Sequence, residues 1–184
     1  MNTRLFNADG SRRTRVRLIK NSEVIKVGDW ITDEASGVAN VDAATEKVSG
    51  YAVAIVTDEG LSLESPAVDT GSLGGTWVSS TKSYTAAADN ETVDGVQVEF
   101  IEAREGDEFI ATLDAAKGTT TGSNKSGYFL SILTSDSSLL DESSASTSRA
   151  SCQFQIANPY TQGLTTEVVV RVMARATDQF AVAT

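Results

Sequence analysis

The sequence contains no histidine and a single cysteine among its 184 residues. Histidine is the usual base in nucleophilic catalysis, and zinc sites are built from clusters of cysteine and histidine, so the composition argues against both chemistries. A lone cysteine forms no internal disulfide, and the fold therefore does not depend on one. Cys152 lies in the strand-like segment CQFQI, where we expect a buried core thiol rather than a nucleophile.

Long apolar runs and phosphate-binding glycine loops are missing as well. No run approaches the roughly 18 apolar residues of a membrane span, and the first residues lack an apolar signal core, so we expect a soluble protein made in a cytoplasm with no membrane partner. Neither GxxxxGK[ST] nor GxGxxG occurs, and no cofactor is expected. The adjacent carboxylates lack the alternating spacing that wraps a calcium ion, which favours solvated turn positions for Asp33–Glu34, Asp58–Glu59 and Asp141–Glu142 and leaves a weak loop-bound calcium ion as the alternative.

Only two prolines interrupt the chain, and no segment shows a sustained 3.6-residue apolar period. Threonine, serine, valine, glycine and aspartate recur throughout, and the hydrophobic fraction of 40% fits a globular protein. Short alternating segments separated by turn residues indicate an all-β fold with little or no helix. We predict a barrel or sandwich of about ten short strands, built from an internally duplicated unit.

The duplication is visible as two related stretches. Residues 49–65 are SGYAVAIVTDEGLSLES, and a close copy returns at 126–143 as SGYFLSILTSDSSLLDES. Each copy follows a Gly-Asp pair at matched spacing, and glycine supplies the positive φ of a tight turn. We therefore predict the same strand–turn–strand plan twice, with Tyr51 and Tyr128 as equivalent packing residues and a hairpin between 96–104 and 108–114.

The segment between the copies contains Pro66, three glycines and Trp77. A structureless loop of this length is improbable inside a compact domain, so we expect an inter-subunit arm that packs through Trp77, with a brief helix at 83–89. The predicted organisation, as one compact domain or two packed subdomains, is an N-terminal arm (1–12), a first β unit (13–65), a linker or excursion (66–93) and a second β unit with closing strands (94–184).

Charge is distributed unevenly along the chain. Its net charge is −10, but residues 1–20 hold six basic residues against one acidic residue, a local charge of +5, so the rest carries −15. Such acidity disfavours nucleic-acid binding, which depends on neutralising phosphates. The segment RTRVRLIK (13–20) alternates and predicts a half-buried strand with Arg13, Arg15 and Arg17 on one face. That face is either a basic stripe docking on an acidic partner or a solvated outer surface.

The order VIKVGDWITDEASGVANVDAATEKVSGYAVAIV (24–56) resembles the small β-barrel proteins of tailed-bacteriophage virions, the capsid decoration or cement proteins. A V-x-x-G-D turn, a small-residue loop and a G-x-A strand carry the resemblance. It implies a non-enzymatic virion protein that binds the capsid surface through non-covalent contacts with the major capsid protein and with itself, as a homo-trimer or dimer. The residues we expect to make these contacts are Arg12, Arg13, Arg15, Arg17, Trp77 and Tyr84.

Two other classes stay open at this stage. A carbohydrate- or receptor-binding β module of a fibre or adhesin would use exposed aromatic rings for stacking, and a carboxylate-only enzyme would need two convergent buried acidic residues in a cleft. A tryptophan at the start of a strand, such as Trp30, is more typical of core packing. The stacking candidates are Trp30, Trp77, Tyr84 and Tyr160.

Overall fold

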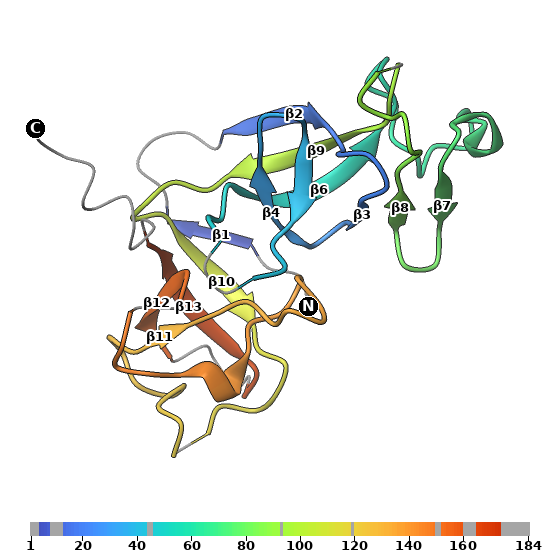
Figure 1. Ribbon diagram of the computed structural model, residues 1–184. Coiled ribbons are helices and arrows are strands. Elements are labelled where there is room, and N and C mark those ends of the chain that lie inside the picture. Colours follow the sequence, from blue (N-terminus) through green and yellow to red (C-terminus); the bar gives the residue numbers. More distant parts are fainter. Residues whose placement is uncertain are drawn as a thin grey trace, which may run out of the picture. The chain divides into compact units, whose positions relative to one another are not determined.

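The computed structural model describes residues 4–7, 13–43, 46–92, 94–118, 120–149, 152–159 and 165–173. These residues form antiparallel strands joined by loops, with two single-turn 3-10 helices, so the all-β prediction is confirmed (Figure 1). The elements are β1 (Arg4–Asn7), β2 (Thr14–Leu18), β3 (Val24–Lys26), β4 (Trp30–Asp33), β5 (Val38–Asn40), β6 (Gly50–Val56), η1 (Thr70–Ser72), β7 (Thr76–Val78), β8 (Ser83–Thr85), β9 (Gln97–Glu102), β10 (Glu108–Thr112), β11 (Phe129–Leu130), η2 (Glu142–Ser144), β12 (Phe154–Asn158) and β13 (Glu167–Val172).

The chain divides into two compact units whose segments interleave along the sequence. The first unit comprises 13–40 and 49–102, and the second comprises 1–12, 41–48 and 103–184. The chain thus passes from one unit to the other at four places. The boundary expected at 94 is displaced because β9 pairs with β2 and β6 of the first unit.

The first unit contains a five-stranded sheet in the order β2-β9-β6-β4-β5. Its two ends meet where Ile19 bridges Val38, and the Lys20 N–H donates to Val38 O at 3.0 Å, so the sheet closes on itself at a seam. Closure removes part of the open edge that a sheet otherwise presents. Gly37 lies at this seam, where an added Cβ would come within 3.0 Å of Leu18 O.

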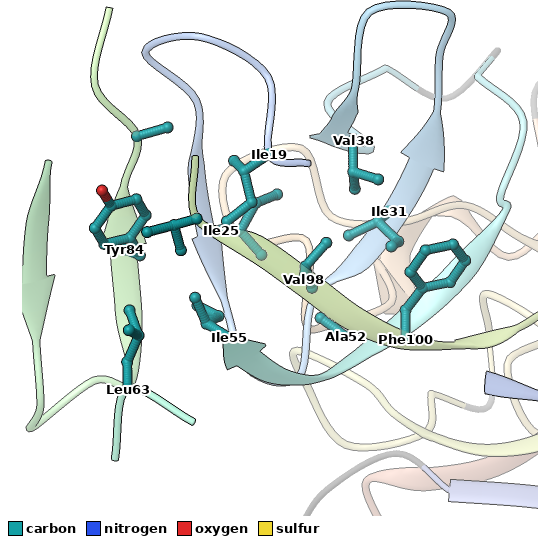
Figure 2. Close-up of a cluster of buried hydrophobic side chains, with 12 residues drawn as sticks. Ile19, Ile25, Ile31, Val38, Ala52, Ile55, Leu63, Tyr84, Val98 and Phe100 are labelled. Carbon is teal, nitrogen blue, oxygen red and sulfur yellow. The ribbon is translucent and has the colours of Figure 1, made fainter. Parts of the chain in front are cut away.

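A three-stranded sheet, β3-β8-β7, completes the first unit. Ile25 pairs with Tyr84 in the register of β3 and β8, and both side chains are fully buried. Figure 2 shows them together with residues of the five-stranded sheet. The shared core consists of Ile19, Ile25, Ile31, Val38, Ala52, Ile55, Leu63, Tyr84, Ala86, Val96, Val98 and Phe100.

Residues 66–92, the described part of the predicted linker (66–93), belong to this unit. They form η1 and the β7–β8 hairpin, and the helix predicted at 83–89 is wrong because residues 83–85 are strand β8. Tyr84 explains the difference, since its burial in the core requires the extended pairing of β8 with β3. Long-range packing outweighs the helix preference of the alanines that follow.

The two Gly-Asp turns have the same geometry, as the repeat predicts. Gly28 and Gly106 both have positive φ, 108° and 90°, and each following aspartate accepts from the backbone N–H three residues earlier. Neither turn closes a hairpin, however. β3 pairs with β8, and β9 pairs with β2 and β6, so each turn joins strands that belong to different sheets, and the predicted 96–104/108–114 hairpin is wrong.

The second unit contains a five-stranded sheet in the order β1-β10-β13-β12-β11. β13 occupies the place that β6 has in the first unit. The Val172 N–H donates to Asp107 O, as the Ala52 N–H donates to Asp29 O. Tyr128, by contrast, is only partly buried and precedes the edge strand β11, so its predicted equivalence with Tyr51 is wrong.

Candidate functional site

The basic segment at the start of the first unit forms β2, an edge strand of the five-stranded sheet. The Glu102 N–H donates to Arg13 O, and the Ile19 N–H donates to Val96 O. Because bonding alternates along an antiparallel pair, the odd-numbered residues direct their backbone groups toward β9. Thr14 and Val16 consequently direct theirs away from the sheet.

The three arginines of β2 make ion pairs with carboxylates of the same unit. Arg13 Nε lies 3.2 Å from Glu102 Oε2, and Arg15 lies 3.0 Å from the other oxygen of that carboxylate. Arg17 lies 3.2 Å from Asp33 Oδ1. Three guanidinium groups therefore share these two carboxylates.

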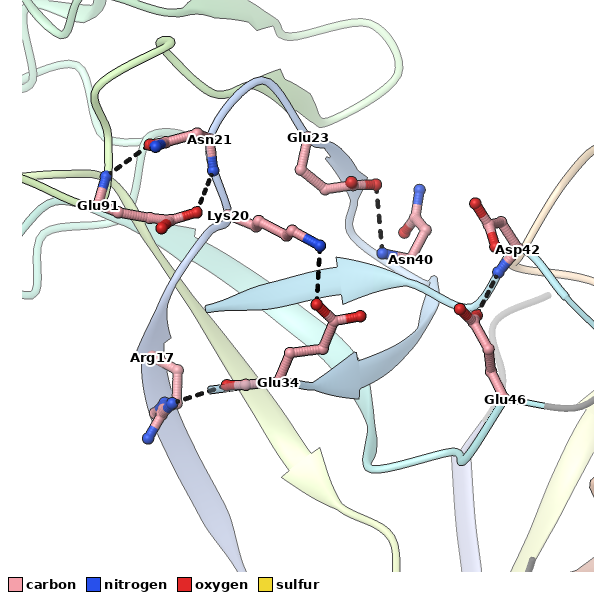
Figure 3. A network of polar contacts seen from close by, with 9 residues as sticks. All are labelled: Arg17, Lys20, Asn21, Glu23, Glu34, Asn40, Asp42, Glu46 and Glu91. Carbon is pink, nitrogen blue, oxygen red and sulfur yellow. Dashed lines mark hydrogen bonds and ion pairs between the residues drawn. The ribbon is translucent and has the colours of Figure 1, made fainter. Parts of the chain in front are cut away.

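Polar contacts also cross the seam of the closed sheet (Figure 3). Arg17 donates to Glu34 O at 3.2 Å, and Lys20 Nζ lies 2.7 Å from Glu34 Oε2. The hydrogen bond from Lys20 to Glu34 raises the pKa of Lys20, with further help from the charge of Glu34. Arg17 and Lys20 of the basic segment thus link β2 to Glu34 across the seam, a contact that the sequence alone did not indicate.

β2 is more exposed than its alternation predicts. Val16, on the face opposite the arginines, is 48% exposed, and Thr14 is exposed as well. The predicted half-buried strand is therefore wrong, because the opposite face of β2 has no covering element among the described residues of its unit. Arg15 and Arg17 keep 53% and 42% of their side-chain surface accessible.

The aromatic candidates lie mainly in the interior. Trp30 and Tyr84 are 0% exposed. The Trp30 ring packs edge-on against Tyr51 with centroids 5.3 Å apart, which confirms the core prediction for Trp30. Trp77 is partly buried and packs against the core of the first unit. Tyr160, like Arg12, lies outside the described residues.

The core position of Tyr84 conflicts with its predicted role in partner binding. Its hydroxyl donates to Leu73 O at 3.0 Å, and burial raises the pKa of this phenol. A side chain with no accessible surface cannot contact another molecule while the unit stays folded. Of the partner-binding candidates, the structure leaves Arg15 and Arg17 the most accessible, with Arg13 and Trp77 partly covered.

A buried carboxylate in the second unit was not expected. Glu142, predicted to be a solvated turn residue, is buried, and its Oε1 accepts from the Gly118 N–H at 2.7 Å and from the hydroxyl groups of Ser123 and Thr121. These hydroxyl bonds lower its pKa, Ser123 contributing most. The interaction anchors the loop of 115–125, and the serine- and threonine-rich composition of that loop is the signal that could have indicated it.

Cys152 is partly buried in front of β12, and burial raises the pKa of its thiol, with a smaller effect of Asp141. A raised pKa reduces the thiolate fraction and makes the group less reactive. Cys152 is therefore not the buried core thiol that the sequence predicted, and it lies outside β12.

An open hollow of about 190 Å³ lies beside η1 in the first unit, and Asp58, Glu59 and Asp69 are among the residues that line it. Asp58 and Glu59 are exposed, so they form no buried acid–base pair. Among the residues placed by the structure, no three metal-ligating side chains converge, and no helix has the length and apolar content needed to cross a membrane.

Comparison with known proteins gave no match: no family model, curated protein or solved structure is similar to this chain at a significant level.

Proposed function

We propose that this chain is a structural, non-enzymatic virion protein that binds the outer surface of a phage capsid and stabilises it, as a decoration or cement protein. Its partners on this proposal are the major capsid protein and further copies of itself, in a homo-trimer or dimer, and its location is the capsid surface. The resemblance of residues 24–56 to such proteins motivates the proposal.

The observation that supports it most is the burial of the aromatic rings. A carbohydrate-binding module would present rings such as Trp30 and Tyr84 to solvent for stacking, but both are 0% exposed. Trp77 is partly buried against the same core. The large aromatic side chains of the first unit thus stabilise its scaffold, which favours a structural protein over a sugar-binding one.

Among the described residues, the outward side of β2 is the surface to which we assign adhesion. Most of the basic charge of this segment is neutralised within the unit, by Glu102, Asp33 and Glu34. Arg15 and the neighbouring Val16 are each about half exposed, and they combine a cation with an apolar side chain. Interfaces are enriched in arginine and depleted in lysine, so Arg15 is the expected anchor.

The proposal is tested by mixing the purified chain with undecorated shells of a tailed phage and measuring occupancy by co-sedimentation and electron microscopy. We expect saturable binding to the outer surface that is weakened in Arg15→Glu. Lys82→Glu, which changes an exposed lysine of the β7–β8 turn by the same charge, is the matched control and should bind normally. Absence of wild-type binding to shells would contradict the proposed function.

A further inference from the structure

We propose that residues 14–16 of β2, whose outer edge pairs with no described strand of the unit, bind an extended segment of a partner protein as an additional strand, and that this segment carries two carboxylates separated by one apolar residue. The inference rests on the proposed function for the identity of the partner, a capsid subunit, but the geometry that supports it is local to β2.

The backbone of β2 is arranged to accept such a strand. The hydrogen bonds of Arg13 and Ile19 to β9 fix the alternation, so the N–H and C=O groups of Thr14 and Val16 point away from the sheet. β2 is a terminal strand in the sheet order, and its outer edge meets β5 only from Ile19 onward, so Thr14 and Val16 have no strand beside them among the described residues of the unit. An exposed edge of this kind is a template for strand addition.

The side chains of β2 determine what the added strand must carry. A residue of the added strand that exchanges hydrogen bonds with Val16 lies directly opposite it, and its side chain lies on the same face as that of Val16. Because Val16 is 48% exposed, an apolar side chain at that position is favoured. The residues before and after it lie opposite Arg15 and Arg17 in non-hydrogen-bonded pairs, in which side chains approach most closely.

Both arginines have donors left for a partner. A guanidinium group has five N–H donors, and Arg15 uses its contact with Glu102 while Arg17 uses those with Asp33 and Glu34 O. With 53% and 42% of their side chains accessible, each can take a further carboxylate. The edge therefore favours a strand with the pattern acidic–apolar–acidic.

A second copy of this chain does not offer that pattern. Two carboxylates separated by one residue occur in the sequence at Asp89-Asn90-Glu91 and Glu105-Gly106-Asp107. Both lie in turns, and neither has a large apolar residue in the middle. The occupant we infer is consequently a segment of a different protein.

The test uses the full chain and a synthetic peptide, GTVEVEVTG, with GTVQVQVTG as its uncharged control. Binding is followed by NMR titration of the backbone amides. We expect the amide signals of Thr14 and Val16 to shift and to gain protection from hydrogen exchange with the glutamate peptide. The glutamine peptide should bind about tenfold more weakly, because it lacks the charge-assisted hydrogen bonds to Arg15 and Arg17.

Two substitutions at one position separate strand addition from simple charge attraction. Val16→Pro removes the outward N–H without touching the bonds to β9, a place where an edge strand tolerates proline, and should abolish peptide binding. Val16→Thr keeps the N–H and the β-branched shape, and should bind the peptide within about twofold of the wild type. Equal thermal unfolding of both variants verifies that the fold is retained.

Several results would overturn the inference. These are equal binding of the two peptides, binding that survives Val16→Pro in the folded variant, absence of any binding by the glutamate peptide, or a concentration-dependent dimer lost in Val16→Pro, which would indicate self-pairing. Because no shell is used, peptide binding without shell binding would reject the proposed function and keep the strand addition. Shell binding that is unaffected by Val16→Pro would keep the proposed function and reject the strand addition.

Discussion

The carboxylate of Asp29 accepts a hydrogen bond from the backbone N–H of Lys26, with 2.7 Å between Oδ2 and the nitrogen. Asp107 makes the same bond to Arg104 at 2.9 Å, and both aspartates are 3% exposed. A side chain that satisfies a backbone donor inside a turn fixes the conformation of that turn. The repeated Gly-Asp pair thus stabilises an equivalent turn in each unit.

Replacing Asp29 with alanine should lower the free energy of unfolding by about 1–3 kcal/mol, because the N–H of Lys26 loses its buried acceptor. Asp29→Asn keeps an acceptor oxygen and should recover part of the loss. Urea unfolding monitored by tryptophan fluorescence measures both. Asp58→Ala, at an exposed position, is the control, and an equal effect there would contradict this role of the turn.

Gly50 should not tolerate a side chain. A Cβ at this position of β6 would lie 2.3 Å from Phe100 Cδ2 and 2.7 Å from Ile101 O, so Gly50→Ala requires the β6–β9 pair to move apart. We expect a loss of about 1–3 kcal/mol or more from overpacking. Gly71→Ala, in the exposed η1, should change the unfolding midpoint little. A Gly50→Ala variant as stable as the wild type would show that the two strands separate easily.

The stability of the seam between β2 and β5 should depend more on the buried side chain of Ile19 than on the ion pairs. Ile19 is 0% exposed, and Ile19→Ala should cost about 2–5 kcal/mol. Arg17→Gln removes the pair with Asp33, which is partly exposed, and should cost less than about 1 kcal/mol, decreasing further at high salt. Denaturant titrations at two salt concentrations measure the free energy of unfolding of both variants. A larger loss in Arg17→Gln than in Ile19→Ala would show that the ion pairs, not the buried isoleucine, hold the seam.

Glu142 should make the second unit sensitive to acid. Hydrogen bonds from Ser123 and Thr121 lower the pKa of Glu142 in the folded state. A carboxyl group with a lowered folded pKa stabilises the fold above its unfolded pKa, and this stabilisation is lost as the pH falls through the folded value. Stability should therefore decrease on acidification below the ordinary glutamate range.

The variant Glu142→Gln provides the matched comparison for this acid sensitivity. It should be less stable than the wild type at neutral pH, and its stability should change less with acidification, because the titrating group is gone. Circular dichroism melts at a series of pH values supply the measurement. Parallel pH profiles for the two proteins would show that other carboxylates dominate the acid response.

Much of the strand content could be read from the sequence. Alternation located β2 and β9, and the apolar run after Gly50 located β6, because the two faces of a strand are visible locally. The short strands β1, β5 and β8 were missed, since three or four residues with mixed polarity give no period. Their pairing depends on partners far away in the sequence.

The candidate site was only partly visible for a related reason. The arginines of β2 could be identified by their spacing, but their pairing with Glu102 and Asp33 could not, because those carboxylates come from other strands. Tyr84 looked like a surface ring in a polar segment and is a core residue. Burial is a property of the assembled sheets, and a local pattern of three residues does not contain it.

The sequence by itself determined the all-β class and the shape of the two Gly-Asp turns, because positive φ at glycine and an aspartate acceptor three residues along are local features. Only the tertiary structure decided which strands these turns join. Strand partners are selected by side-chain packing between distant segments, so two copies of one turn connect different sheets, and β6 corresponds in place to β13 rather than to the repeated Ser-Gly-Tyr stretch.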